Sequence, residues 1–240
     1  MKSYLLTIAA LSLVATGFNI PVNAQDDFNH SQSQSSASLS TNLAQNINTV
    51  PNTAEGYLHR GISYIKLGEA TKALADFDRA IELNPNNVDI YINRGIAYIQ
   101  LRDLEQALTE FSKAIEVNPK YDRAYYNRGL TYFHLRKPEQ ALTDFSQAIK
   151  INPQSAEAYT NRGAAYAELG ESKKALNDFT QAILINPNDA KAYLNRGVIN
   201  YYHFDKISQS REDLNKAAEL FLEQGDSRSY QRVRNLLQQF

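Results

Sequence analysis

The sequence predicts an all-α protein, built as an α-solenoid of stacked antiparallel helical hairpins with a C-terminal capping helix. Three observations predict this fold. Prolines and glycines recur every 34 residues, apolar residues follow helical spacing within each repeat, and an amphipathic stretch follows the last repeat. A period of this length is typical of helix–turn–helix repeats, in which each hairpin buries its apolar face against the next.

Composition excludes several classes of function. The chain has 240 residues, 43% of them hydrophobic and 21% charged, which is ordinary for a globular protein. Its 25 Lys and Arg oppose 26 Asp and Glu, so the net charge of −1 argues against a nucleic-acid partner bound through phosphates. The absence of cysteine excludes disulfides, thiol catalysis and zinc–thiolate sites.

Residues 1–24 have the order of a secretory signal peptide. Lys2 precedes an apolar run too short for a membrane span, which needs about 20 residues. Pro21 follows, and Val22 and Ala24 suit cleavage after Ala24. We therefore expect export across the inner membrane, to the periplasm, the thylakoid lumen or the exterior. An uncleaved anchor is the alternative, and we expect membrane association only through such an anchor or through a partner.

Residues 25–53 are rich in Ser, Gln and Asn and carry little apolar periodicity. Such a segment cannot bury enough apolar surface to offset its chain entropy, so we predict a flexible tether. It is either a spacer or simply an unstructured N-terminus.

The repeat is marked by prolines and by glycines that each follow an arginine. The prolines are Pro51, Pro85, Pro119, Pro153 and Pro187, and the glycines are Gly61, Gly95, Gly129, Gly163 and Gly197. The predicted repeats are 54–87, 88–121, 122–155 and 156–189, with a degenerate fifth repeat over 190–224 and the capping helix within 225–240.

Each repeat is predicted to hold two helices. In the first repeat Gly68 ends the first helix, because glycine tolerates the left-handed backbone, and Pro85 stops the second. The fifth repeat departs from this pattern, since Asn200 stands in the place of Tyr166. One extra residue in its turn restores the apolar spacing at Leu214.

These motifs resemble the tetratricopeptide repeat (TPR) family. The matching residues of the first repeat are Tyr57, Gly61, Tyr64, Ala73, Phe77, Ala80 and Pro85. They recur in the next three repeats, and the Asn-Arg-Gly form is similar to that of bacterial, especially cyanobacterial, members. The resemblance implies a right-handed TPR superhelix whose first helices line a concave face that binds a protein or peptide partner.

An acidic residue follows each repeated arginine at a fixed distance. The pairs are Arg60 with Asp76, Arg94 with Glu110, Arg128 with Asp144, Arg162 with Asp178 and, with the extra residue, Arg196 with Asp213. In an antiparallel hairpin this spacing predicts a ladder of ion pairs between helices. A row of arginines for acidic ligands is the alternative.

Four asparagines stand two residues before the glycines, namely Asn93, Asn127, Asn161 and Asn195. The resemblance extends to the superhelix of O-GlcNAc transferase, where an asparagine ladder at this place holds an extended peptide backbone. A carboxamide both donates and accepts hydrogen bonds, so it can pair with any peptide bond. The alternative is that these side chains cap turns or face water.

Further peptide-binding residues are expected beside this ladder: Tyr126, Leu130, Phe133, Arg123 and Lys191. The Lys and Asn set that captures a C-terminal carboxylate in related clamps is missing. We therefore predict an extended internal segment as the ligand.

No catalytic constellation is present. His30, His59, His134 and His203 lack metal-ligand spacing, so we expect no enzyme activity, no metal and no cofactor. The predicted function is a non-enzymatic scaffold or adaptor in the assembly of an envelope or membrane complex. A self-associating structural subunit is the alternative, and we expect a monomer or a weak homo-oligomer.

Overall fold

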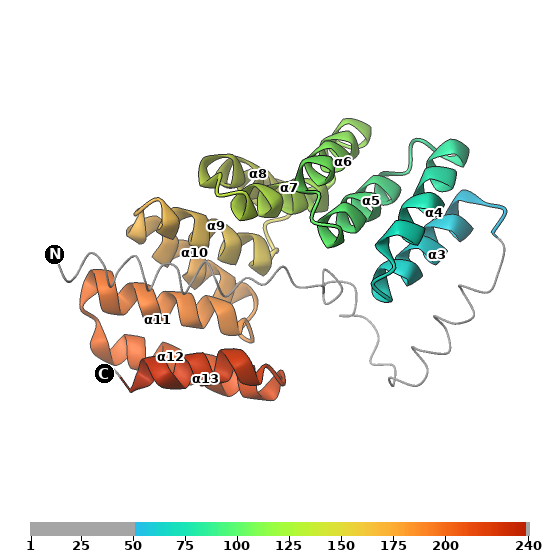
Figure 1. Ribbon diagram of the computed structural model, residues 1–240. Coiled ribbons are helices and arrows are strands. Elements are labelled where there is room, and N and C mark those ends of the chain that lie inside the picture. The colour runs from blue at the N-terminus through green and yellow to red at the C-terminus, as the bar shows by residue number, and fades with distance from the viewer. Residues whose placement is uncertain (1–50, 239–240) are drawn as a thin grey trace. The chain divides into compact units, whose positions relative to one another are not determined.

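The computed structural model describes residues 51–238, so the predicted signal peptide and nearly all of the predicted tether lie outside the described residues. Every regular element of this part is an α-helix, and the helices form successive packed pairs (Figure 1). The helices are α3 (Ala54–Lys66), α4 (Ala70–Leu83), α5 (Val88–Gln100), α6 (Leu104–Val117), α7 (Asp122–His134), α8 (Pro138–Ile151), α9 (Ala156–Glu168), α10 (Ser172–Ile185), α11 (Ala190–Phe204), α12 (Ile207–Glu223) and α13 (Ser227–Leu237). The predicted all-α solenoid of helical hairpins is confirmed.

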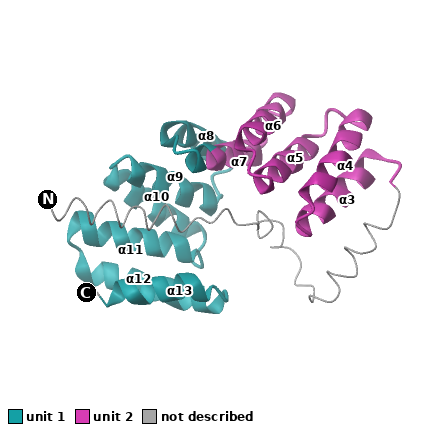
Figure 2. Ribbon diagram, in the orientation of Figure 1, with its two compact units in different colours: residues 1–19, 132–240 teal, residues 20–131 magenta. Residues whose placement is uncertain are grey.

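The described chain divides into two compact units, coloured separately in Figure 2. The N-terminal unit covers residues 51–131 and the C-terminal unit covers residues 132–238. Helix α7 contributes residues to both units.

Short polar side chains set the ends of the helices. Thr53 Oγ1 accepts a hydrogen bond from the backbone N–H of Gly56 and so caps the start of α3. At the other end of each second helix in the first four pairs, an asparagine stands before the repeated proline. Its carboxamide oxygen accepts from the backbone N–H two residues later, as at Asn118 and Lys120 (3.0 Å). The Asn-Pro step therefore turns the chain toward the next pair.

The turn inside each of the first four pairs needs one residue with a left-handed backbone. Gly68 and Gly170 supply it with φ of 75° and 77°. Arg102 and Arg136 take the same place with φ of 62° and 58°, although they carry a Cβ. The predicted role of Gly68 is confirmed, and the turn geometry persists where the glycine is absent.

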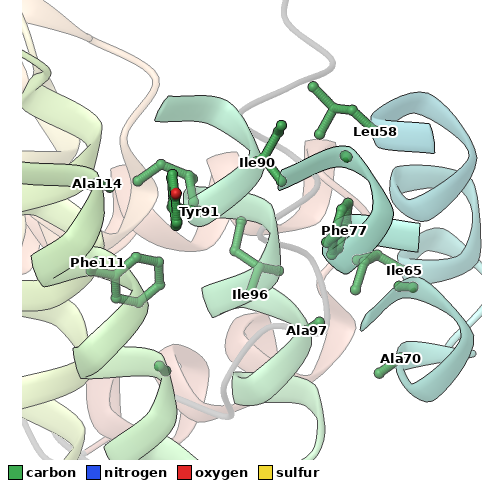
Figure 3. Close-up of a cluster of buried hydrophobic side chains, with 14 of the residues drawn as sticks. Leu58, Ile65, Ala70, Phe77, Ile90, Tyr91, Ile96, Ala97, Phe111 and Ala114 are labelled. Atoms are coloured by element: carbon green, nitrogen blue, oxygen red, sulfur yellow. The ribbon is translucent and has the colours of Figure 1, made fainter. Parts of the chain in front are cut away.

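The core of the N-terminal unit is a layer of phenylalanine rings packed against glycine. Phe77 and Phe111 are fully buried, with Ile90, Tyr91 and Ile96 beside them (Figure 3). A Cβ added to Gly95 would lie 2.5 Å from a ring atom of Phe111. The glycine therefore allows α5 and α6 to approach closely enough for the ring to fill the space between them.

The fifth pair is longer than the others. Helix α11 has 15 residues and α12 has 17, against 13 and 14 in the preceding pair. Leu214 is fully buried in place of the repeated phenylalanine, as the predicted extra residue requires. Helix α13 packs on this pair through the buried Val233.

Candidate peptide-binding face of the first helices

Three of the four ladder asparagines are held by their own helix. Nδ2 of Asn93, Asn127 and Asn161 donates to the carbonyl oxygen four residues earlier, on Asp89 (2.8 Å), Arg123 (2.8 Å) and Glu157 (2.9 Å). Each contact fixes the rotation of the carboxamide. The four asparagines also share a low exposure of 8%, 9%, 6% and 4% in chain order.

This contact engages only one group of the carboxamide. An asparagine amide has two N–H donors and an oxygen acceptor. In Asn93 the carbonyl of Asp89 takes one of the two donors. The second N–H and the oxygen of Asn93 are the groups that it can offer to a peptide bond, in an orientation set before the ligand arrives, whereas Oδ1 of Asn161 is buried.

The other predicted site residues fall in both units. In the N-terminal unit Arg123, Tyr126 and Leu130 are half-buried on α7, where the carbonyl of Arg123 binds Asn127 directly. In the C-terminal unit Phe133 is buried and Lys191 is exposed at the start of α11. Helices α9 and α11 contact each other, so Asn161 and Asn195 lie on neighbouring first helices.

Two hydrogen bonds near the asparagine ladder were not predicted from the sequence. The Tyr121 hydroxyl donates to the carboxylate of Asp89, and burial together with this hydrogen bond raises the pKa of Tyr121. Thr160 Oγ1 donates to Oδ2 of Asp189 at 2.7 Å. Both contacts join one first helix to the N-terminal end of the next. Their residue types do not recur at a 34-residue interval, so periodicity could not reveal them.

The repeated arginines form the predicted ladder of ion pairs. The guanidinium donates through Nε and Nη2 to both oxygens of its acidic partner in the pairs Arg60–Asp76, Arg94–Glu110, Arg162–Asp178 and Arg196–Asp213. The same guanidinium lies over the tyrosine three residues earlier, at 5.5 Å for Arg162 and Tyr159. The structural interpretation of this arginine series is confirmed for these four pairs.

Neither a metal site nor a membrane span is found in the described part of the chain. Within residues 51–238 no three His, Asp or Glu side chains come close enough together to hold a metal ion. In the same range no helix has both the length and the apolar character needed to cross a membrane.

Two sequence profiles match the chain. The profile "Tetratricopeptide repeat" matches residues 122–155 and 156–189, and the profile "TPR repeat" matches residues 61–102 and 97–135. Together they span residues 61–189, more than half of the chain. This chain is a tetratricopeptide repeat protein. Both profiles describe repeat modules and neither describes a catalytic domain.

Solved structures share the fold of this TPR protein. YrrB, described as a TPR protein with an unusual peptide-binding site, is 24% identical with a TM-score of 0.58, over 80% of this chain and 97% of its own. MamA from Desulfovibrio magneticus RS-1 is 23% identical with a TM-score of 0.63, over 73% and 99%. TTC0263, a thermophilic TPR protein from Thermus thermophilus, is 23% identical with a TM-score of 0.62, over 77% and 99%. No curated protein matches the chain.

Proposed function

We propose that this TPR protein is a non-enzymatic scaffold that binds an extended segment of a partner protein along its first helices. The observation that carries the proposal is the repeated asparagine, held by the carbonyl four residues earlier on α5, α7 and α9. A carboxamide fixed in this way recognises a main chain without regard to its side chains. The shared fold of YrrB, a protein described as having a peptide-binding site, supports this role.

The free energies of hydrogen bonding and of association decide which other contacts this face must make with a peptide. One hydrogen bond contributes about 0.5–1.5 kcal/mol net, so four amides contribute a few kcal/mol at most. Association costs about 4–15 kcal/mol in lost freedom. Apolar anchors are therefore required, and the half-buried Leu130 follows Asn127 on α7 by one helical turn. We expect an affinity near micromolar for an internal segment.

The test compares two double variants. Peptides selected from a random dodecapeptide phage library on the wild-type chain are labelled, and their affinity is measured by fluorescence anisotropy. Asn93→Ala with Asn127→Ala, both on first helices of the N-terminal unit, should weaken binding at least tenfold, because two amide contacts are lost. Asn177→Ala with Asn215→Ala changes two asparagines on second helices, away from the ladder, and should leave the affinity unchanged. If both double variants bind the selected peptides with equal affinity, the asparagine ladder takes no part in peptide binding.

We also propose that the protein works after export, in the assembly of an envelope or membrane complex. The apolar run that follows Lys2 and the small residues before Gln25 support this part of the proposal. Fractionation and N-terminal sequencing test it. The expected result is a chain that begins at Gln25 in the exported fraction, and a cytoplasmic chain with an intact N-terminus contradicts it.

A further inference from the structure

The fifth helix pair departs from the repeat in its internal contacts. The half-buried Tyr and the buried Phe and Ala of the repeat are replaced in α11 and α12 by Asn200, Leu214 and Ser210, which are all buried. Ser210 Oγ donates to the carbonyl of Gly197 at 2.8 Å, so its hydroxyl is satisfied. Oδ1 of Asn200 is buried and accepts no hydrogen bond from any residue of the described chain. A buried acceptor left without a donor is destabilising, but the fourth pair also has one, Oε2 of Glu168, so this atom alone does not distinguish the two pairs.

The same replacement removes a ring that binds two cations. In the fourth pair Lys174 Nζ lies 5.1 Å and Arg162 Cζ 5.9 Å from the centre of the Tyr166 ring. Asn200 takes the place of Tyr166 in the repeat and provides no such surface. The fifth pair therefore loses these contacts between a ring and two cations.

The link between the fourth and fifth pairs also lacks a contact found elsewhere. Nη1 of Arg162 donates to Ser146 of the preceding pair at 3.3 Å, as Nη1 of Arg128 does to Ser112 at 3.1 Å. The corresponding residues of the last junction are Arg196 and Thr180, and no hydrogen bond joins them in the described structure. Thr180 Oγ1 donates instead to the carbonyl of Leu176.

The hydrogen bonds that cross this junction lie near the ends of the helices, whereas Ile199 of α11 packs in a buried apolar cluster with Phe179 and Ala175 of α10. Thr160 bonds to Asp189, Ser172 Oγ lies 2.9 Å from Nδ1 of His203, and Gln224 Nε2 donates to the carbonyl of Asn188 at 3.0 Å. The junction thus keeps its apolar packing and the hydrogen bonds near its ends, but it lacks the hydrogen bond from the arginine.

In a stack of repeats, stability is a sum of the intrinsic stability of each repeat and its interface with the next. The fifth pair lacks the cation–ring contacts of Tyr166 within the pair and the arginine hydrogen bond to the pair before it. We propose that α11, α12 and α13 unfold together as one unit while α9 and α10 stay folded. This opening exposes the face of α10 around Phe179 and removes Asn195 from the proposed ladder, so it would regulate access to both surfaces.

Native-state hydrogen exchange of the full chain at low urea tests this inference. The expected result is one shared opening constant for the amides of α11, α12 and α13, at least tenfold larger than that for α9 and α10. Thr180→Asp gives Arg196 a carboxylate partner and should lower the shared constant about threefold, as one exposed ion pair would. Asn200→Tyr should also lower it, because it restores the repeat's ring.

Thr143→Asp is the matched control, since Thr143 Oγ1 also donates to a carbonyl of its own helix (Glu139, 3.1 Å) and the residue is exposed. It should leave the exchange of α11–α13 unchanged. Opening constants for α11–α13 equal to those of α9 and α10 overturn the inference, and so does opening of α13 alone. If Thr143→Asp and Thr180→Asp slow the hydrogen exchange of α11–α13 equally, the role assigned to Arg196 is overturned. None of these readouts requires the proposed peptide ligand.

Discussion

Nη1 of Arg94 lies 2.7 Å from Oδ1 of Asp78, although the two residues belong to successive helix pairs. The same guanidinium donates to Glu110 through Nε (2.9 Å) and Nη2 (3.0 Å). Burial alone would lower the pKa of Arg94, but the hydrogen bonds and charges of Glu110 and Asp78 outweigh it and raise the pKa. One permanently charged side chain thus joins α4, α5 and α6.

Ser112 occupies the place of Asp78 in the next pair, where its hydroxyl accepts from Nη1 of Arg128 at 3.1 Å. Ser112→Asp should convert this hydrogen bond into an ion pair. We expect the free energy of unfolding to rise by about 0.2–1 kcal/mol, the range for partly exposed pairs. Urea denaturation followed by circular dichroism measures it.

Thr109→Asp is the control for this substitution. Thr109 is exposed on the same helix, and its Oγ1 also donates to a carbonyl four residues earlier, that of Glu105. It should not raise the free energy of unfolding. Equal stabilisation by both variants would mean that added charge on α6, and not Arg128, is responsible.

Arg162→Met should change the free energy of unfolding far more, and should lower it, because it leaves the carboxylate of Asp178 without its partner. The Asp178 side chain is 8% exposed and that of Arg162 is 19% exposed. Removing one member of such a pair costs about 3 kcal/mol. The double variant Arg162→Met with Asp178→Leu leaves no buried charge, so it should lose less than the single variant in chemical denaturation. A double variant less stable than the single one would contradict this account.

The sequence predicts any contact that recurs with the period of the repeat. Arg162 and Asp178 could be paired because their separation of 16 residues is found in four repeats and becomes 17 in the fifth. The same reasoning placed the left-handed turn at Gly68, which the structure confirms.

Contacts whose chemistry changes from repeat to repeat could not be predicted in this way. The residue that accepts the hydrogen bond from Nη1 of the arginine is Asp78 in one pair and Ser112 in the next, so no constant residue type marks it. The hydrogen bond from Asn93 to the carbonyl of Asp89 involves a backbone group, which the sequence does not identify. Peptide binding by the asparagine ladder stays a prediction.

Gly95→Ala should destabilise the fold more than Gly197→Ala. The new Cβ would lie 2.5 Å from a ring atom of Phe111 in the first variant, but 3.0 Å from Cγ of Leu214 in the second. Overpacking of this kind costs about 1–3 kcal/mol, and the larger value is expected where a rigid ring must move. Thermal unfolding of the two variants measures the difference. Adding Phe111→Leu to Gly95→Ala should recover part of the loss, and no recovery would contradict the packing argument.

Two histidines should make stability depend on pH. Burial lowers the pKa of His134, and the charge of Arg136 lowers it further. Burial also lowers the pKa of His203, whose Nδ1 lies 2.9 Å from Ser172 Oγ. The unfolded chain holds these protons more tightly than the folded chain, because an unperturbed histidine has a pKa of about 6.5. Stability must therefore rise with pH across this window.

The free energy of unfolding should be at its full value above about pH 7 and should fall as the pH drops from about 6.5 through the lowered folded pKa values. Urea denaturation between about pH 7.5 and pH 5 measures this loss. His134→Gln and His203→Asn each remove one titrating ring, so each should flatten the curve, and His203→Asn keeps a group that can accept from Ser172. His59→Asn changes an exposed imidazole and is the control. If the His134→Gln and His203→Asn variants keep the full wild-type slope, carboxylates and not these histidines set the acid response.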